Sequence, residues 1–483
     1  MKLALVAWCA AWQLVTNAGA DAFLRSEEQT AVGVNLVATE AADMFTVAIC
    51  KSPSAALFLG VKCPTSNSNN VAPGPAPVLS DTATYAFHAL AIGDWGVDVG
   101  LGSCCNKYRK TGTNTEAYYK DRQAQPNVAY LLSLSAARLK PKVIIGHGDN
   151  FYWNGVGSDD VDYRFQNTFE EMYSQDSLKG VRWINVMGNH DYGGANYICG
   201  KWDYQFYRCP NEAELLKQLE ERFTRQSQYK SPNNDRWKMP AHYYVETLKD
   251  DASGVTVDIF NVDSNAATVH GGEQICCQCY GYMTEDGGNI NCNDVHRGHK
   301  YCMGGDTALF DKCLAKVKSW QDDSMQQLAR DAKSSKATWK VVNSHYSPHF
   351  HMEPNMMNDW FKVLSDSGVQ VFFAGHTHAE SHEFAVFNTH FFTNGAGGGI
   401  QSESIGAPPP YATQVQSLWT GADNPYGFFE LSFGKEQMRA QFITFDNNWS
   451  FKMRLGDTVK GGTAVGHCWL IPKDGTLGRA CAS

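Results

Sequence analysis

The stretch Phe87–Gly96, with the sequence FHALAIGDWG, is an apolar run that stops abruptly at Gly-Asp-Trp-Gly. The same change from apolar to polar residues recurs further along the chain. Apolar runs end in GHGDN after Val143–Ile145, in GNHD after Trp183–Met187, in NSH after Trp339–Val342 and in GHTH after Val369–Ala374. Short apolar runs that end in turn residues are typical of buried β-strands. We therefore expect a strand at each run, followed by a polar loop.

Amphipathic helices are predicted between these runs, at Glu116–Lys140, Val161–Leu178, Glu212–Tyr229, Trp320–Lys333 and Met356–Ser367. Strands that alternate with helices predict an α/β sheet architecture. Later runs have no helices between them and are expected to form antiparallel strands; they are Phe384–Thr393, Gly427–Phe433, Met438–Phe445 and Trp449–Arg454. We expect one α/β domain with a cysteine-rich insertion at about residues 268–313.

The composition excludes several classes of protein. The chain has 483 residues, of which 43% are hydrophobic, so it is too long for a disulfide miniprotein and too apolar for a disordered chain. Its 41 basic and 50 acidic residues give a formal net charge of −9, without a polybasic block. Nucleic acid and anionic membrane surfaces are therefore not expected as partners.

The first residues have the pattern of a signal peptide. Lys2 precedes the apolar run Leu3–Val15, and the small residues Ala18-Gly19-Ala20 follow. This pattern predicts a cleavable signal peptide at residues 1–20, and the apolar run is too short to span a membrane. We therefore expect a secreted or lumenal protein that is not anchored in a membrane. Asn448-Trp449-Ser450 is a sequon for N-glycosylation.

The cysteines agree with this location. Cleavage of the signal peptide would leave 14 of the 15 cysteines, an even number that favours disulfides in an oxidising compartment. Six of them lie in the insertion, namely Cys276, Cys277, Cys279, Cys292, Cys302 and Cys313. A zinc module is the alternative, because Cys276 and Cys279 have the spacing of zinc ligands and two histidines, His296 and His299, lie nearby.

The polar loops contain side chains that are suited to bind metals, namely Asp94, Asp149, Asn189, His345, His376 and His378. Each residue alone fits a turn, a helix cap or an ordinary loop. Together they follow the ends of successive strands, where ligands gather in α/β sheets. Mixed oxygen and nitrogen donors suit Fe, Zn or Mn better than Mg or Ca. A shared carboxylate can hold two cations about 3.5–4 Å apart, which bind phosphate and activate a hydroxide.

These motifs, together with Gly148–Tyr152, resemble the signature of the calcineurin-like metallophosphoesterases. More narrowly, they resemble purple acid phosphatases of the small, tartrate-resistant animal type. The resemblance spans about residues 85–455 and leaves out the cysteine-rich insertion. It implies a β-sandwich flanked by helices, in four α/β/β/α layers, with a dinuclear metal site at the carboxyl ends of strands. The implied catalytic domain is 84–455, after an extension at 21–83 and before a C-terminal tail at 456–483.

Carried over by position, the resemblance implies a ferric site and a divalent site that share Asp149. The ferric ligands would be Asp94, Asp149, Tyr152 and His378, and the divalent ligands Asp149, Asn189, His345 and His376. Tyr152 is the discriminating residue, because a phenol with a pKa near 10 is a poor ligand for divalent ions and binds Fe(III) as phenolate. The divalent ion would be Fe(II), Zn(II) or Mn(II). The implied reaction is hydrolysis of phosphomonoesters by a hydroxide held at the Fe(III)–M(II) centre.

Histidines near the metals are expected to assist the leaving group. His190 is the first candidate. The resemblance places a second histidine nine residues after His345, but this chain has Pro354 there. His349 and His351 lie nearby, and His351 is favoured because His-Met-Glu resembles a plant-type stretch. Two alternatives stay open: an esterase for diesters, nucleotides or pyrophosphates, and a secreted binding protein on a phosphatase fold.

Overall fold

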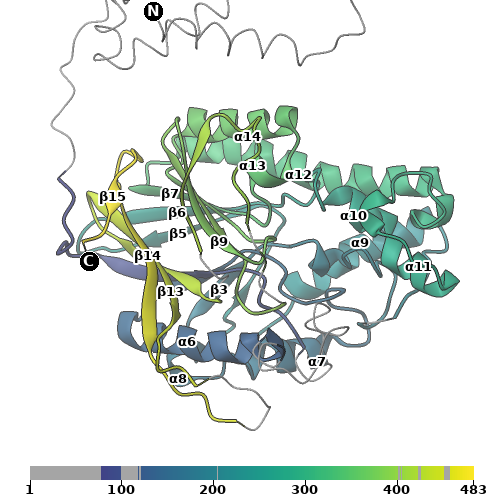
Figure 1. The fold of residues 1–483 in the computed structure, drawn as a ribbon, viewed down its shortest axis with the longest axis horizontal. Helices are drawn as coiled ribbons and strands as arrows, with labels where there is room; N and C mark the ends of the chain where they lie inside the picture. Colours follow the sequence, from purple (N-terminus) through teal and green to yellow (C-terminus); the bar gives the residue numbers. More distant parts are fainter. Residues whose placement is uncertain are drawn as a thin grey trace, which may run out of the picture. The chain divides into compact units, whose positions relative to one another are not determined.

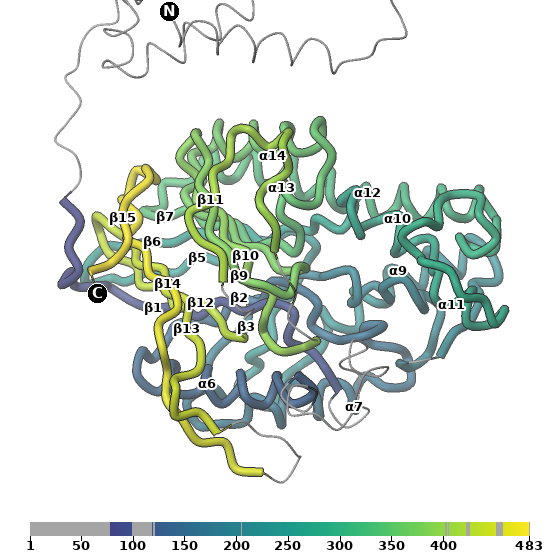
Figure 2. Tube along the Cα trace, viewed as in Figure 1, coloured from purple at the N-terminus to yellow at the C-terminus, as the bar shows by residue number. Residues whose placement is uncertain are grey.

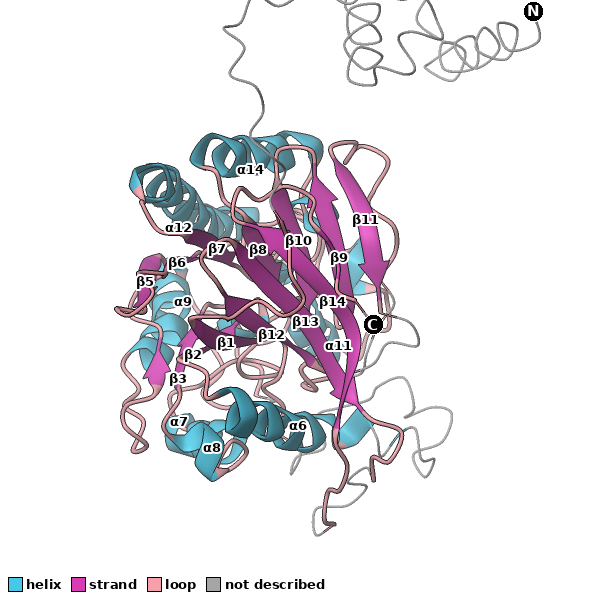
Figure 3. Ribbon diagram, turned by 90° about the vertical axis from the view of Figure 1, so that its left-hand side faces the viewer, coloured by secondary structure: helices cyan, strands magenta, loops and turns pink. Residues whose placement is uncertain are grey.

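The computed structural model describes residues 78–98, 118, 121–203, 205–400, 403, 405–421, 426–450 and 457–482. They belong to a unit that spans Pro77–Ser483. Their strands form two mixed sheets, which lie between two groups of helices (Figures 1 and 3). The predicted signal peptide, the extension up to residue 77 and the cysteines at 50, 63, 104 and 105 lie outside the described residues.

The first sheet has the strand order β15-β14-β13-β12-β1-β2-β3-β4. Strands β1 to β4 run parallel, whereas β12 pairs antiparallel with both β1 and β13. Figure 2 shows β12 beside β1, and Phe433 pairs with Phe87 although they are far apart in the sequence. The strands are β1 Phe87–Ile92, β2 Val143–Gly146, β3 Arg182–Asn185, β4 Trp237–Lys238, β12 Phe428–Phe433, β13 Gln437–Phe445, β14 Thr463–Pro472 and β15 Arg479–Ala480.

The second sheet has the order β11-β9-β10-β8-β7-β6-β5. Its centre is parallel, from β6 through β7 and β8 to β10, and antiparallel strands lie at both edges. The strands are β5 Tyr244–Lys249, β6 Thr256–Asn261, β7 Trp339–Asn343, β8 Val371–Ala374, β9 Glu380–Ala385, β10 Thr389–Asn394 and β11 Val415–Thr420.

Helices cover the outer faces of both sheets. In Figure 3, α6, α7 and α8 lie on the side of the first sheet, and α12 and α14 lie on the side of the second. The helices are α6 Ala124–Leu139, α7 Val161–Arg164, α8 Asp176–Lys179, α9 Glu212–Ser227, α10 Gly272–Cys277, α11 Cys279–Asp286, α12 Thr307–Ser334, α13 Pro348–His351 and α14 Pro354–Ser367. No helix in this described part is long and apolar enough to cross a membrane.

The alternation of side chains along β1 explains the layers. Leu90 and Ile92 belong to the apolar cluster that packs against α6, whereas Ala89 and Ala91 belong to the cluster between the two sheets. Successive residues of a strand point to opposite faces, so a strand that is apolar throughout is buried on both sides. A third cluster packs the second sheet against α12 and α14. The predicted α/β architecture in four layers is confirmed.

Disulfides join the cysteines of the insertion. The bonds are Cys276–Cys313, Cys277–Cys302 and Cys279–Cys292, and two further bonds join Cys199 to Cys209 and Cys468 to Cys481. The prediction of disulfides is confirmed for these ten cysteines. The alternative of a zinc module is wrong, because a cysteine in a disulfide has no thiolate to offer a metal.

Several predicted elements differ in their bounds. The run Phe384–Thr393 was expected as one strand, but it contains a hairpin between β9 and β10. Its turn holds Val386, which is 69% exposed, and Asn388, which has a φ of 66°. Because this turn contains apolar residues, the hydropathy pattern of the sequence does not reveal it. The helix predicted at Trp320–Lys333 starts earlier, at Thr307, because Asp306 caps the backbone N–H of Leu309.

The C-terminal segment 456–483 contributes to the first sheet. β14 pairs with β13 along its length, and Cys481 is bonded to Cys468 within β14. At the other end of the described chain, Asp81 forms an ion pair with Arg479 at 2.7 Å. Both ends of the described chain are therefore tied to the same edge of the sheet.

A chain of three histidines joins β14 to the second sheet. His390 Nε2 lies 3.1 Å from the carbonyl oxygen of Thr476, which can only accept a hydrogen bond. His390 therefore donates from Nε2 and accepts at Nδ1 from His382, 2.9 Å away, and His382 accepts in turn from His467 at 3.0 Å. His382 and His390 are neutral in this arrangement, since an added proton on either Nδ1 would place two N–H groups face to face. Burial lowers the pKa of both His390 and His467 to about 4.

We predict that these histidines destabilise the fold in acid. A folded-state pKa of about 4, below the ordinary value of about 6.5, means that the unfolded chain binds more protons between these pH values. The stability contribution is present above pH 6.5 and is lost as the pH falls to about 4, by roughly 3 kcal/mol for His390. Urea unfolding at pH 7.0, 5.5 and 4.5 should show a shallower pH dependence for His390→Gln than for the wild-type protein.

The control is His296→Ala, which changes an exposed histidine whose side chain has 67% relative exposure. This variant should keep the wild-type pH dependence. Equal slopes for His390→Gln and the wild-type protein would contradict the role assigned to the histidine chain.

Candidate metal centre

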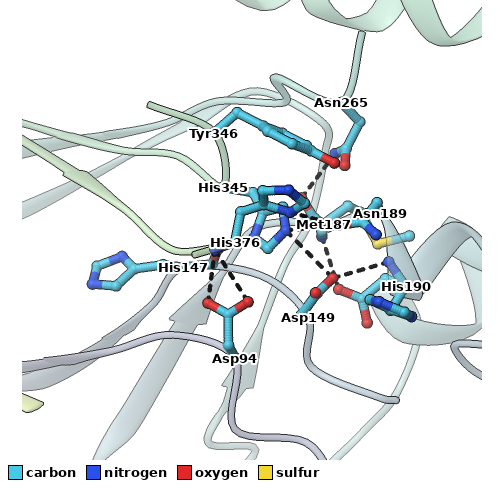
Figure 4. A network of polar contacts seen from close by, with 12 residues as sticks. Asp94, His147, Asp149, Met187, Asn189, His190, Asn265, His345, Tyr346 and His376 are labelled. Carbon is cyan, nitrogen blue, oxygen red and sulfur yellow. Dashed lines mark hydrogen bonds and ion pairs between the residues drawn. The ribbon is translucent and has the colours of Figure 1, made fainter. Parts of the chain in front are cut away.

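The candidate ligands follow the carboxyl ends of strands in both sheets. Asp94, Asp149 and Asn189 come after β1, β2 and β3, which are adjacent parallel strands. His345 follows β7, and the segment with His376 and His378 follows β8, its parallel neighbour. Parallel strands bring such loops to one edge of each sheet. The structure brings all of these loops together at one site (Figure 4).

Two glycines allow the loops to approach one another closely. A Cβ atom on Gly188 would lie 2.2 Å from Asp149 Oδ1, and one on Gly375 would lie 2.2 Å from Asp94 Oδ2. Asp94, Asp149 and His376 have φ angles of 55°, 50° and 67°, in the left-handed region that costs energy for side chains with a Cβ. Strained backbone of this kind clusters at functional sites, where the surrounding structure holds it in place.

One group of ligands surrounds the Tyr152 hydroxyl. Tyr152 Oη lies 2.9 Å from Asp94 Oδ1 and 3.1 Å from His378 Nε2. Asp94, Asp149 and His378 each offer an atom within 4.8 Å of the others, and all three side chains are buried. The backbone N–H of His376 donates to both oxygens of Asp94, at 3.1 and 2.9 Å. This group therefore brings oxygen and nitrogen donor atoms close to one another.

A second group surrounds the side-chain oxygen of Asn189. His345 Nε2 lies 3.0 Å from Asn189 Oδ1, and His376 Nδ1 lies 3.1 Å from the same atom. His345 Nε2 also lies 3.5 Å from Asp149 Oδ1. Figure 4 shows His345 and His376 side by side, with Asp149 below them. Asp149 therefore contacts both groups.

The donor set fits cations. His345 donates from Nδ1 to the carbonyl oxygen of His147 at 2.8 Å, so its Nε2 carries a lone pair. This lone pair faces the oxygens of Asn189 and Asp149, which are also acceptors. Asp149 Oδ2 is buried and has no hydrogen-bond partner within the protein. Acceptors that face one another without protons repel, and a metal ion placed among them removes the repulsion.

The electrostatics of the site lead to the same conclusion. Burial, reinforced by the charge of Asp149, raises the pKa of Asp94 well above its usual range. Burial and the two carboxylates raise the pKa of the Tyr152 phenol as well. Burial lowers the pKa of both His345 and His376, so both imidazoles are neutral. Neutral imidazoles are the form that binds metal, and a cation would favour ionised Asp94 and Tyr152.

A cavity of about 620 Å³ opens above the ligands. Its lining includes Asp149, Asn189, His376 and His378, and it also includes His190 and Trp153. This volume is in the range of sites for small molecules. The candidate ligands therefore line a cavity that can admit a small molecule.

His190 is held with one ring nitrogen free. Its Nδ1 lies 2.6 Å from the carbonyl oxygen of Trp153, so Nδ1 carries the proton and donates it. Its backbone N–H donates to Asp149 Oδ1 at 2.9 Å. The side chain is half-buried and lines the cavity, which leaves Nε2 available to a bound molecule.

His349 and His351 do not line this cavity. His351 accepts from the backbone N–H of Ser347 at 3.2 Å and donates from Nε2 to Thr377 Oγ1 at 3.1 Å. His349 is buried beside Glu383, with His349 Nε2 3.6 Å from the carboxylate. The ring centroids of His351 and His376 lie 4.8 Å apart, so His351 packs against the candidate ligand His376.

Sequence reasoning missed two residues that shape the site. Asp191 accepts from Gly188 N–H at 2.8 Å and from Asn150 and Phe151 N–H at 3.1 Å, so it joins the loops after β2 and β3. Its place in the GNHD motif was the available signal. His270 lines the cavity with its ring 6.0 Å from that of His376, and nothing in the sequence near it pointed to this position.

The chain matches a known family and is similar to several known proteins. The family described as "Calcineurin-like phosphoesterase" matches residues 87–380, more than half of the chain. Human tartrate-resistant acid phosphatase type 5 is 33% identical over 141 residues, which are 27% of this chain and 38% of the human protein. Purple acid phosphatase 17 of Arabidopsis thaliana is 25% identical over 313 residues, which are 64% of this chain and 67% of the plant protein. The match to the human relative thus spans well under half of that protein.

Among the solved structures that are similar to this chain is that of a Plasmodium protein, described as "GAP50 the anchor in the inner membrane complex of Plasmodium". It aligns with 78% of this chain and 88% of its own, at a TM-score of 0.45 and 15% identity.

We predict that His378→Ala weakens metal binding. Its ring joins the group formed by Asp94 and Asp149, and removal of one nitrogen donor leaves the carboxylates incompletely compensated. After dialysis against a weak chelator, elemental analysis should find less metal per chain than in the wild-type protein. His296→Ala is the control, since its ring is exposed and does not line the cavity. Equal metal content in all three proteins would contradict the site.

Proposed function

Because this chain belongs to the calcineurin-like phosphoesterase family, we propose that it is a secreted acid phosphatase that hydrolyses phosphomonoesters at a dinuclear Fe(III)–M(II) centre. Its relatives include acid phosphatases of animals and plants. The observation that carries the proposal is Tyr152, whose hydroxyl lies 2.9 Å from Asp94 and 3.1 Å from His378. A phenolate among these donors selects a trivalent ion over a divalent one.

The proposed ligand sets follow the two groups of side chains. Asp94, Asp149, Tyr152 and His378 would hold Fe(III), and Asp149, Asn189, His345 and His376 would hold Fe(II), Zn(II) or Mn(II). The contacts of Asp149 with both groups support its role as the shared ligand. When bound, the cations would neutralise charge on the phosphate oxygens and lower the pKa of the attacking water.

His190 is proposed to assist the departing oxygen. The carbonyl of Trp153 holds its Nδ1 proton, and this contact fixes the ring so that Nε2 faces the cavity. When protonated, Nε2 can donate to the oxygen that leaves phosphorus, and it can later take up a proton from the product site. The backbone N–H of His190 steadies Asp149 at the same time.

His351 is proposed to position the ligand loop instead of donating a proton. Both of its ring nitrogens are engaged, one with Ser347 N–H and the other with Thr377, which lies between His376 and His378. His349 is proposed to help hold Ser347, the partner of His351, since His349 Nδ1 lies 3.1 Å from Ser347 Oγ. This assignment replaces the expectation that one of them faces the leaving group.

Secretion is supported by features of the described chain. Its five disulfides are typical of an oxidising compartment. The sequon residue Asn448 is exposed, so a glycan can be attached there. Both features agree with the predicted signal peptide.

Tyr152→Phe tests the ferric site. Wild-type protein secreted from a eukaryotic host should contain iron and show a broad absorption band in the visible range. The variant should lose this band while it retains iron, because charge transfer from phenolate to Fe(III) requires the phenolic oxygen. A wild-type protein that is active but colourless and free of iron would contradict the ferric assignment.

The same wild-type preparation tests the substrate class. Nitrophenyl phosphate should be hydrolysed much faster than bis(nitrophenyl) phosphate. A preference for the diester would favour the alternative of a diesterase on this scaffold, and hydrolysis of neither would favour a binding protein.

His190→Ala should lower kcat without loss of metal. General acid catalysis contributes about 10²–10⁴-fold, and its loss matters most when the leaving alkoxide is a strong base. The fall in kcat should therefore be larger for ethyl phosphate than for nitrophenyl phosphate, whose phenolate leaves without a proton. Equal falls for both substrates, or none for ethyl phosphate, would reject the role of His190. His296→Ala serves as the control histidine.

A further inference from the structure

The cysteine-rich insertion forms the wall of the cavity that faces the metal ligands. Gln274, Tyr280, Thr284 and Asn293 of the insertion all line it. They come from α10, from α11 and from the short 3-10 helix Cys292–Asp294. In Figure 1, α10 and α11 lie beside α9 and one end of α12, away from the edge strands β14 and β15. A bound phosphoester would thus meet the metal ligands at one end and the insertion at the other.

Disulfides hold this wall in place. Cys276, two residues after Gln274, is bonded to Cys313 in α12. Cys279, next to Tyr280, is bonded to Cys292, next to Asn293. Gln274, Tyr280 and Asn293 are therefore each within two residues of a cross-link. A surface that is fixed before a ligand binds loses less conformational entropy on binding.

The wall is also fixed to the loop that carries His190. Gln278 is buried and joins α10 to α11. Its amide donates to the carbonyl oxygen of Gly194 at 2.9 Å, and its oxygen accepts from the backbone N–H of Ile198. The backbone N–H of Tyr280 donates to the carbonyl oxygen of Ala195 at 2.9 Å. The position of Tyr280 is therefore set relative to His190.

The chemistry of this wall is aromatic and amide-rich. Tyr280 is 44% exposed, and Tyr197 and Trp153 line the same cavity. Gln274 Nε2 donates to Asn293 Oδ1 at 2.9 Å. This bond orients both amides and leaves the Gln274 oxygen and the Asn293 nitrogen with capacity for a ligand. Such a surface offers ring faces and neutral hydrogen-bonding groups.

We propose that the insertion is the leaving-group subsite of this enzyme, and that it selects monophosphate esters whose alcohol carries an uncharged ring, either aromatic or a sugar. The inference rests on the proposed function, because the metal centre must hold the phosphate. Tyr280 provides a ring face, and the pair Gln274–Asn293 provides hydrogen bonds to hydroxyl groups. Ring contacts of this kind and neutral hydrogen bonds strengthen binding of the part of the substrate that does not react.

Steady-state kinetics with paired substrates tests the subsite. Benzyl phosphate and ethyl phosphate have leaving alcohols of similar basicity, and they differ by the ring. The wild-type protein should have the lower KM for benzyl phosphate. Tyr280→Ala should raise the KM for benzyl phosphate about three- to tenfold relative to that for ethyl phosphate, as expected for loss of one ring contact. Since this binding is the same in ground and transition states, kcat should change little.

Two further variants separate the contribution of the Tyr280 ring from that of the Asn293 amide. Tyr280→Phe keeps the ring and should keep the wild-type KM for benzyl phosphate. Asn293→Ala should raise the KM for glucose 6-phosphate more than that for benzyl phosphate, if the subsite takes a sugar. If Tyr280→Ala raises the KM for benzyl phosphate and neither variant raises the KM for glucose 6-phosphate, the subsite binds aromatic rings. Tyr207→Ala is the matched control, because Tyr207 is 49% exposed and lies outside the cavity lining.

The outcomes distinguish the inference from the proposed function. If the wild-type protein hydrolyses none of these esters, the proposed function fails and the inference fails with it. If it hydrolyses them but Tyr280→Ala and Asn293→Ala leave every KM ratio unchanged, the inference alone is wrong.

Discussion

Two buried carboxylates, Asp94 and Asp149, lie in one cluster with His378, where their atoms come within 4.8 Å. Two negative charges at this distance, removed from water, are costly unless positive charge compensates them. The neighbouring imidazoles of His345 and His376 are neutral, so they do not supply that charge. These side chains therefore form a candidate metal site. The same close packing explains the strained backbone at Asp94 and Asp149. It also explains why glycine is needed at positions 188 and 375, where the backbone approaches these carboxylates closely.

The fold serves this requirement through its parallel strands. The candidate oxygen ligands follow β1, β2 and β3 in one sheet, and the candidate nitrogen ligands follow β7 and β8 in the other. A continuous apolar cluster packs the two sheets against each other, so the two sets of candidate ligands keep their relative positions. Asp191 and Tyr152 then join the loops of the first sheet to each other and to the second.

The loops with Asp94, Asp149 and His345 could be predicted from the sequence, because a buried strand that ends in a polar residue is a local pattern. The same reasoning placed β1 at its observed bounds. It failed at Phe384–Thr393, where the apolar Val386 hides a turn in a run of apolar residues. The roles of His270 and Tyr280 could not be predicted either. The position of Tyr280 depends on disulfides and on the contacts of Gln278, and the carbonyl oxygen of His270 accepts from Tyr346 Oη; these contacts join residues far apart in the chain.

Anomalous diffraction at the iron edge, from crystals of the secreted protein, tests the claim of a shared dinuclear site most directly. We expect an iron peak beside Tyr152 Oη and a second metal peak beside Asn189, about 3.5–4 Å away, with Asp149 between them. A single metal, or an iron that contacts Asn189 but not Tyr152, would contradict this claim.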